Sequence, residues 1–550
     1  MPSAAVAAPI VLPLVFAALI AIFGMAGIDL GRTAAGAGAW SCVAALFAVW
    51  LPIRSSLELV LGQLGYGSSL DLRLDGVSFA FALMIAVPAA VLLTLQPRPW
   101  SDAAIGLVGL AASIAAVEAG GLILTAIAGG TAATVAVMLL DTEDPDAQRP
   151  SWGFLLAAWL ALALVGVFLQ VGGGTAVYSA VPVSAVTAPV FALLAAAAVL
   201  GSGLLPWRTW PAQLWTRPSL RAAGLTVATL FPLGFYLLVR AYELGDGHYP
   251  TTAFNVLLSI LGLTVALSAA ARAQAAATRR EFLAEVVPGL GGFALMAVAL
   301  GTPLGLVSGI VMLAVASAFV ACLALLPDRA GIESVVAIAA AVGLPPSVTF
   351  GAHVLGIGAT FEAGDFLGLL GLAAAIAWMV WVVAGARAIG LPGGRGHPSA
   401  ETFPMVAMAI ALFALAGGPA LALFQLGFAN PVASEVMRSA ASTLGGGSTS
   451  VVTTSSLLAV VTLFVPLLLI AIAVYFATNT RAIRSQARPP LFAVPSARFA
   501  DLRDTLKGAT VPEEYRSVFS FRELEAAAAR GNPIVWLVAL VALGFAVTRF

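Results

Sequence analysis

Apolar runs of roughly 20 residues recur along most of this 550-residue chain, separated by short polar or glycine- and proline-rich stretches. The hydrocarbon core of a bilayer needs about 20 apolar residues to be crossed by an α-helix. The runs are continuous and do not alternate, which favours helices over the strands of a β-barrel. We therefore predict an all-α polytopic membrane protein with about 14–16 transmembrane helices.

The predicted spans lie near residues 5–28, 34–53, 77–95, 104–119, 121–140, 151–171, 186–205, 219–240, 251–272, 287–301, 304–326, 331–356, 364–388, 402–427, 454–477 and 534–549. The stretch 104–140 is too long for one span and is divided at Gly120-Gly121. Pro345-Pro346 breaks the span 331–356, because proline removes a backbone donor and clashes with the preceding turn.

The segment "PWRTWPAQLWTRPSLR" between two apolar runs is short, rich in Trp and Arg, and contains Pro206 and Pro218. It predicts an unwound stretch near 206–221 that links two half-helices. Such breaks are tolerated at membrane depth where protein or a water-filled cavity covers the freed backbone.

Residues 478–532 form the only long polar segment. Ser520 and Glu523 match a capping box, so part of the segment is predicted to be helical and to lie along the membrane surface. Its nine basic residues place it in the cytoplasm by the positive-inside rule. A plain cytoplasmic loop without a mechanical role is the alternative.

Composition supports the membrane class, since 61% of the residues are hydrophobic and only 9% are charged. The net charge is zero, which gives no indication of a nucleic-acid partner. Cys42 and Cys322 lie far apart in apolar runs and suggest neither a disulfide framework nor a metal cluster. The sequence contains no P-loop or dinucleotide fingerprint, so we predict no cofactor, no metal and no redox centre in this chain.

Ionisable residues inside apolar runs are the candidate functional residues, because each is costly in a membrane. The candidates for a proton path are Glu118, Arg208, Arg221, Arg279, Arg280, Glu285 and His353. Among the basic candidates only the imidazole changes its charge near neutral pH, since arginine does not release its proton in proteins. His353 could be a terminal proton site, or it could be hydrogen-bonded to backbone freed by Pro345-Pro346. Arg208, flanked by tryptophans, could instead extend to the membrane interface.

Four stretches in the same order resemble the antiporter-like subunits of respiratory complex I and of related hydrogenase and cation/proton antiporter complexes. They are "LRLDGVSFAF" (72–81), the stretch from Pro206 to Arg240, "RREFLAEVVPGLGGF" (279–293) and "GLPPSVTFGAH" (343–353). The resemblance implies a core of fourteen helices with two inverted five-helix repeats, each with one broken helix. It also implies a polar axis of glutamate, lysine and histidine across the middle of the membrane.

The resemblance divides the chain into six parts. They are N-terminal helices (1–103), a first repeat with a break near 206–221 (104–240), a second repeat with a break near 343–356 (251–427), a C-terminal helix (428–477), a cytoplasmic lateral segment (478–532) and a terminal anchor (533–550). The last two resemble a shortened form of the tail of the longest family member.

The family's functional residues are only partly present. Its glutamate in the fifth helix falls at about Gly130, its partner lysine at Gly201, and the histidine between the half-helices at Thr226. A further lysine becomes Arg280, or Arg279 with a one-residue shift, and the terminal lysine becomes His353. The resemblance therefore implies a partly degenerate proton path.

Four hypotheses remain open from the sequence. The first is a membrane subunit of a complex related to NADH-quinone oxidoreductase or membrane-bound hydrogenase, which moves protons or other monovalent cations across a bacterial inner membrane. Partner membrane and peripheral subunits would carry its catalysis. The second is a membrane subunit, paired with a soluble zinc protein, that accumulates inorganic carbon. The third is a stand-alone exchanger, against which the missing glutamate and lysine argue, and the fourth is a scaffold without an ion path.

Overall fold

The computed structural model describes residues 3–436 except 66–67, 144–151, 206–209, 216, 218–219, 248, 328–330 and 394–401. Arg208 and the predicted breaks at Pro206 and Pro218 lie outside the described residues. So do the predicted spans 454–477 and 534–549, the lateral segment 478–532, the terminal anchor 533–550 and most of the C-terminal helix 428–477.

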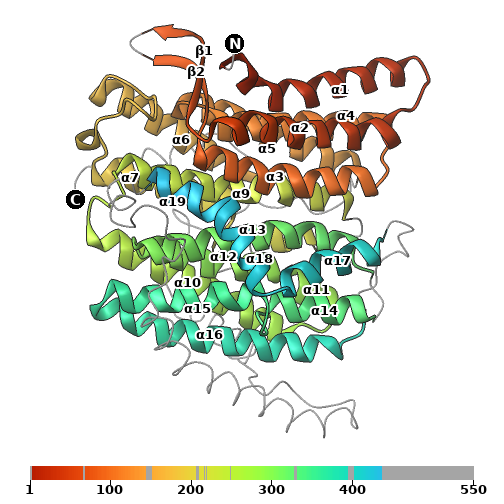
Figure 1. Ribbon diagram of the computed structural model, residues 1–550, viewed down its shortest axis with the longest axis vertical. Coiled ribbons are helices and arrows are strands. Elements are labelled where there is room, and N and C mark those ends of the chain that lie inside the picture. Colours follow the sequence, from red (N-terminus) through yellow and green to blue (C-terminus); the bar gives the residue numbers. More distant parts are fainter. Residues whose placement is uncertain are drawn as a thin grey trace, which may run out of the picture.

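The described chain is a bundle of roughly parallel and antiparallel helices (Figure 1). In chain order the first elements are η1 (Ser3–Ala7), α1 (Ala8–Met25), α2 (Gly31–Ile53), β1 (Leu57–Gly65), β2 (Ser68–Leu74), α3 (Gly76–Leu95), α4 (Trp100–Glu118), α5 (Leu122–Glu143), α6 (Trp152–Gly173), η2 (Val183–Ala185), α7 (Ala188–Ser202), α8 (Trp210–Trp215) and α9 (Arg221–Leu244). They are followed by α10 (Thr252–Ala275), α11 (Arg279–Ala284), α12 (Val286–Ala299), α13 (Pro303–Leu325), α14 (Ile332–Ala341), α15 (Val348–Ala363), α16 (Asp365–Ile389), α17 (Pro404–Leu415), α18 (Gly418–Phe424), the π-turn η3 (Gln425–Ala429) and α19 (Asn430–Val436).

Within the described residues, 11 helices are long and apolar enough to cross a membrane, or up to 12 if the bent pair α17–α18 counts as one span. Two shorter apolar helices, α7 and α14, add the first halves of broken spans. The prediction of an all-α polytopic membrane protein is confirmed. The positions of the predicted spans from residue 5 to residue 388 agree with the helices, because each follows one continuous apolar run.

Two five-span sets follow one another in the chain and lie in the upper and lower parts of Figure 1. The first set is α4, α5, α6, α7–α8 and α9, and the second is α10, α11–α12, α13, α14–α15 and α16. The fourth span of each set is broken. Since five spans separate the start of the first set from the start of the second, the two sets begin at opposite ends of the bundle and are inverted relative to each other.

The first break begins earlier than its prolines. Helix α7 ends at Ser202, and Gly203 takes a left-handed conformation with φ +69° that favours glycine. The second break spans the residues between α14 and α15, where Gly343 has φ +78°. Helix α15 then restarts at Val348 with the Ser347 hydroxyl accepting from the Phe350 amide at 3.0 Å. His353 therefore lies inside the second half-helix, not in the break.

The predicted span 402–427 is not one straight helix. Helices α17 and α18 meet at an angle of 92°. Gly417 lies at the bend with φ +63°, and a Cβ there would stand 2.6 Å from the Pro346 carbonyl oxygen. The sequence signal for the bend is the Gly417-Gly418-Pro419 run inside an otherwise apolar stretch.

A two-stranded antiparallel hairpin, β1–β2, was not predicted and projects from one end of the bundle (Figure 1). Leu72 of β2 also forms an isolated bridge with Ala119, and Gly121 forms a second isolated bridge with Val177. These bridges close the end of the first set where α4 meets α5. We call this end of the bundle the hairpin face. We call the opposite end, where several arginines bind helix ends, the arginine face.

Candidate functional site

The ionisable side chains of the described spanning helices lie close to the helix ends, with one exception. His353 is the sixth residue of α15, and α15 begins at a break inside its span. Helices α6, α7, α12 and α13 contain no Asp, Glu, Lys, Arg or His at all. The charged groups of the described chain therefore form two layers, with one imidazole between them.

His353 is buried between aromatic rings. The Trp378 ring stacks on it at 4.8 Å and 9°, and the Phe293 ring meets it edge-on at 4.5 Å. Its Nδ1 lies 2.7 Å from the Thr349 carbonyl oxygen, so Nδ1 carries a proton and donates it. Its Nε2 is buried and has no hydrogen-bond partner among the described residues.

The backbone freed at the second break does not bind His353. The Val342 carbonyl at the end of α14 accepts from Trp378 Nε1 at 2.9 Å. The Trp378 side chain thus hydrogen-bonds a backbone carbonyl at the break through its nitrogen and stacks on the imidazole with its ring face. His353 instead bonds a carbonyl of its own helix, and its second nitrogen remains available for proton exchange.

At the arginine face, guanidinium groups bind the backbone carbonyls at helix C-termini, where four carbonyls per helix have no intrahelical partner. Arg280 donates to the carbonyls of Trp215 and Arg217, after the short helix α8. Arg217 donates to the Leu140 carbonyl in the last turn of α5. These bonds connect the start of α11 in the second set to α8 and α5 in the first.

Two further arginines, Arg387 of α16 and Arg279 of α11, bind backbone carbonyls at the ends of α10 and α16. Arg387 donates to the carbonyls of Gln274 and Ala276 at 2.6 and 2.7 Å, at the end of α10. Arg279 donates to the Leu391 carbonyl at 2.9 Å, just after the end of α16. Because these bonds fix helix ends, Arg279 and Arg280 hold charge and position rather than exchange protons.

The remaining candidates at the arginine face lie near these groups. Glu285 sits in the short break between α11 and α12, 3.0 Å from Arg272. Arg221 begins α9, and its carbonyl accepts from Arg98 at 2.6 Å. A cavity of about 20 Å³ borders Arg279 and Arg280, room for about one water molecule.

Glu118 lies at the other end of the molecule from these arginines. It is the last residue of α4, directly before the bridged residues at the hairpin face. Its side chain is fully buried, and neither carboxyl oxygen has a hydrogen-bond partner among the described residues. The structure therefore does not bring Glu118 together with Arg279, Arg280 or Arg221.

Close helix packing replaces polar groups inside the first set. A Cβ at Gly234 of α9 would lie 2.2 Å from the Ser202 backbone nitrogen of α7, so the two backbones touch there. Gly201 faces the same crossing, with its own Cβ position 3.4 Å from the Gly234 Cα. A Cβ at Gly201 would therefore already be in van der Waals contact with the α9 backbone.

Gly130 and Thr226, where the resemblance expects a glutamate and a histidine, also have no ionisable partner among the described residues. Gly130 packs beside Trp159, whose Cβ would be 3.8 Å from an added Cβ. Thr226 is buried, and its hydroxyl has no hydrogen-bond partner among the described residues. Thr226 borders a cavity of only about 10 Å³, at the lower limit for one water molecule.

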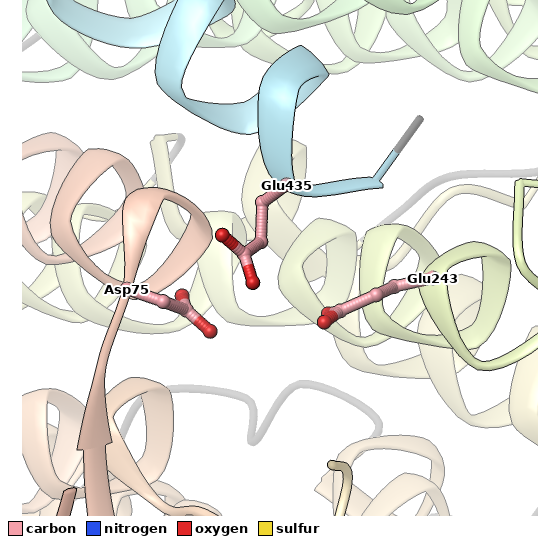
Figure 2. Close-up of side chains that lie close together, drawn as sticks. All are labelled: Asp75, Glu243 and Glu435. Carbon is pink, nitrogen blue, oxygen red and sulfur yellow. The ribbon is translucent and has the colours of Figure 1, made fainter. Parts of the chain in front are cut away.

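The hairpin face holds a buried ion cluster that the sequence did not predict, made of Arg73, Asp75, Arg240, Glu243 and Glu435. Figure 2 shows its three carboxylates converging from the start of α3, from α9 and from α19. Arg240 binds both Asp75 oxygens at 2.8 Å and also pairs with Glu243. Arg73 lies 2.9 Å from Asp75, 2.8 Å from Glu435 and 3.4 Å from Glu243.

Asp75 is the centre of this cluster and also caps α3, since it accepts from the Ser78 amide at 2.8 Å. Burial alone would raise the pKa of Asp75, but Arg240 and Arg73 hold that pKa below its ordinary value. The three carboxylates lie close enough to bind a cation together. Two guanidinium groups already occupy their oxygens, so the cluster is held by ion pairs.

The sequence contained part of the signal for this cluster. Asp75 lies in the "LRLDGVSFAF" stretch, and Arg240 ends the second stretch that carries the family resemblance. Their pairing across 165 residues, however, depends on the tertiary fold. Glu435 comes from a helix whose place in the bundle no local pattern indicates.

Comparison with family models and with curated proteins gives no match. Solved structures do match. A chain of the Mrp complex from Dietzia sp. DQ12-45-1b aligns with 98% of this chain at 20% identity and a TM-score of 0.69. This chain spans 63% of the length of that Mrp chain.

Two further structures give the same result. A chain of respiratory complex I from Thermus thermophilus aligns over 80% of this chain and all of its own length, at 21% identity and a TM-score of 0.64. A chain of the archaeal membrane-bound sulfane sulfur reductase aligns over 74% of this chain and 75% of its own, at 17% identity and a TM-score of 0.62. At these identities the likeness shows the fold alone, which this chain shares with chains of these three membrane complexes.

Proposed function

We propose that this chain is a membrane subunit of a multi-subunit, ion-translocating complex, related to NADH-quinone oxidoreductase or membrane-bound hydrogenase, with a partly degenerate proton path. Partner membrane and peripheral subunits carry the catalytic chemistry, and protons or other monovalent cations are the transported species. The fold shared with chains of three respiratory and Mrp complexes supports this proposal.

The observation that carries the proposal is the distribution of ionisable groups across the described bundle. The two inverted sets keep their broken helices, but the described residues of the first set include no ionisable group between its two faces. Its crossing at Gly201 and Gly234 is closed by contact between the backbones of α7 and α9. The first set therefore acts as a scaffold.

The second set keeps one group that can exchange protons. The Nδ1 of His353 donates to a helix carbonyl, and its Nε2 is free among the described residues to accept a proton. A relay through the imidazole takes up a proton at Nε2 while the bond to Thr349 and the two aromatic rings fix the ring orientation. Water has to connect His353 to both faces, since no side chain in the described helices does.

The orientation follows from the arginines. Arg98, Arg217, Arg279, Arg280 and Arg387 all lie at the arginine face. Cytoplasmic ends of membrane proteins carry an excess of basic residues. We therefore propose that the arginine face lies on the cytoplasmic side of a bacterial inner membrane, the side that the basic residues of 478–532 predict for that segment.

The test is purification of the intact complex and measurement of proton flux after reconstitution into vesicles. Co-purifying membrane and peripheral subunits are expected. His353→Gln keeps a polar side chain but cannot take up a proton, so it should lower proton flux about tenfold or more while the subunits still assemble. Normal flux with normal assembly would leave the chain as a scaffold without an ion path of its own, and a chain that purifies alone would contradict the proposal.

A further inference from the structure

The last described segment, residues 404–436, runs across the front of the bundle from the arginine face to the hairpin face, shown in blue in Figure 1. We call this segment the strap. It consists of α17, α18, η3 and α19 and contacts α13, α14, α15 and α3 along its course. The bend of the strap meets the second helix break, and its C-terminal end meets the ion cluster.

The bend of the strap lies directly on the second break. A Cβ at Gly417 would stand 2.6 Å from the Pro346 carbonyl oxygen, so this glycine permits backbone contact. Helix α17 packs against α14 before the break, and α18 packs against α15 after it. Leu421 of α18 touches α15 at Gly351, where an added Cβ would be 2.9 Å from its Cδ2 atom. The bend thus contacts both half-helices, including the one that carries His353.

The other end of the strap is held by backbone contact and by charge. A Cβ at Gly76, the first residue of α3, would lie 2.4 Å from the Pro431 carbonyl oxygen. Four residues later, Glu435 forms an ion pair with Arg73 at 2.8 Å. Both contacts are made within two residues of the cluster centre, Asp75.

Glu435 is the most exposed carboxylate of the cluster, and an exposed ion pair is weaker than a buried one. The side chain of Glu435 is 20% exposed, compared with 11% for Glu243 and 0% for Asp75. Glu58 of the hairpin lies 3.9 Å from Arg73 and is 46% exposed, so a second carboxylate is in place to approach Arg73 when Glu435 leaves.

We propose that the strap couples the ion cluster to the second helix break, so that the pairing of Glu435 with Arg73 sets the position of the bend against α15. The proposed function enters only in what the coupling would control, namely the helix that carries His353. The coupling itself is a property of the fold. By reciprocity, a change at either end must alter the other end by the same free energy.

The experiment measures both ends by distances between spin labels in the full chain, purified with its partners. The two native cysteines are replaced by serine. One label pair, Leu423→Cys with Phe361→Cys, reports on the break end, and a second pair, Leu426→Cys with Leu61→Cys, reports on the cluster end. All four positions are exposed, so labels fit there without disturbing the core.

Glu435→Gln keeps the side-chain shape and removes the charge. It should shift or broaden the distance distribution of the break-end pair, whose strap label at Leu423 lies 12 residues (435 − 423) from the substitution along the chain. Gly417→Ala, which adds a methyl group against Pro346, should alter the cluster-end pair in turn. Glu58→Gln is the matched control at the same arginine and should leave the break-end pair unchanged.

The proposal is overturned if each substitution changes only the pair at its own end. If Glu435→Gln does not assemble, Glu435→Asp keeps the charge but shortens the side chain, which weakens the contact with Arg73 and gives the same test in a milder form. The distances do not depend on ion transport. A failure of the coupling is therefore distinguishable from a failure of the proposed function, which the flux measurement with His353→Gln reports.

Discussion

The two five-span sets share one architecture and differ in what fills it. In the first set, the broken helix α7 crosses α9 by backbone contact between Ser202 and Gly234. In the second set, the corresponding break is bordered by an imidazole, a tryptophan and the bend of the strap. The broken helix of the first set is thus part of a packed interface, while that of the second keeps a group that can exchange protons.

The difference teaches that a broken helix does not by itself indicate an ion path. Breaks are tolerated wherever the freed backbone is covered, and Gly203 and Gly343, which begin the two breaks, are both buried. A path also needs groups that bind and release protons at accessible cost. Only the second set has such a group between its faces in the part of the chain that the structure describes.

The largest expected effect comes from the arginines near the end of the fifth span in each set, Arg240 of α9 and Arg387 of α16. Arg240→Gln leaves Asp75 buried with one guanidinium fewer, which should cost about 3–5 kcal/mol of unfolding free energy. Arg387→Gln removes bonds to two backbone carbonyls from a half-buried site and should cost about 1–2 kcal/mol. Thermal unfolding of the two variants in detergent measures the difference, and equal losses would contradict the asymmetry between the sets.

A smaller effect is expected from the packing of the first set. Gly234→Ala places a methyl group against the Ser202 backbone and should destabilise the protein by about 1–3 kcal/mol. Gly130→Ala is the control, because the nearest atom to its new methyl group is 3.8 Å away. If Gly234→Ala is as stable as Gly130→Ala, the first set is not closed by backbone contact.

The sequence located the helices but not what joins them. Each apolar run from residue 5 to residue 388 became a helix or a broken helix, because burial in a bilayer requires it. The hairpin was missed because "LELVLGQLG" is a short alternating stretch directly after a span. The bend at Gly417 was missed because the run around it is apolar on both sides.

The candidate site was only partly predictable for a similar reason. Local sequence placed His353 after a break, and the structure keeps it buried in the same half-helix. Nothing local indicates that Trp378 would bind both Val342 and the imidazole ring. The ion cluster joins residues 165 and 362 positions apart, so only the folded bundle brings them together.

The smallest expected effect concerns the second break. Trp378→Phe keeps an aromatic ring against His353 but removes the donor to the Val342 carbonyl, which should cost about 1–2 kcal/mol. Trp159→Phe in the first set is the matched control, because its indole nitrogen has no hydrogen-bond partner among the described residues. Chemical unfolding that ranks Trp159→Phe as the more damaging change would refute the role given to Trp378.

If only the second set retains a proton site, a substitution in each set should affect proton flux through the assembled complex differently. His353→Gln in the second set should lower the flux about tenfold or more. Thr226→Val in the first set should leave the flux at the wild-type rate. Equal loss of flux in both variants, or loss with Thr226→Val alone, would contradict a proton site confined to the second set.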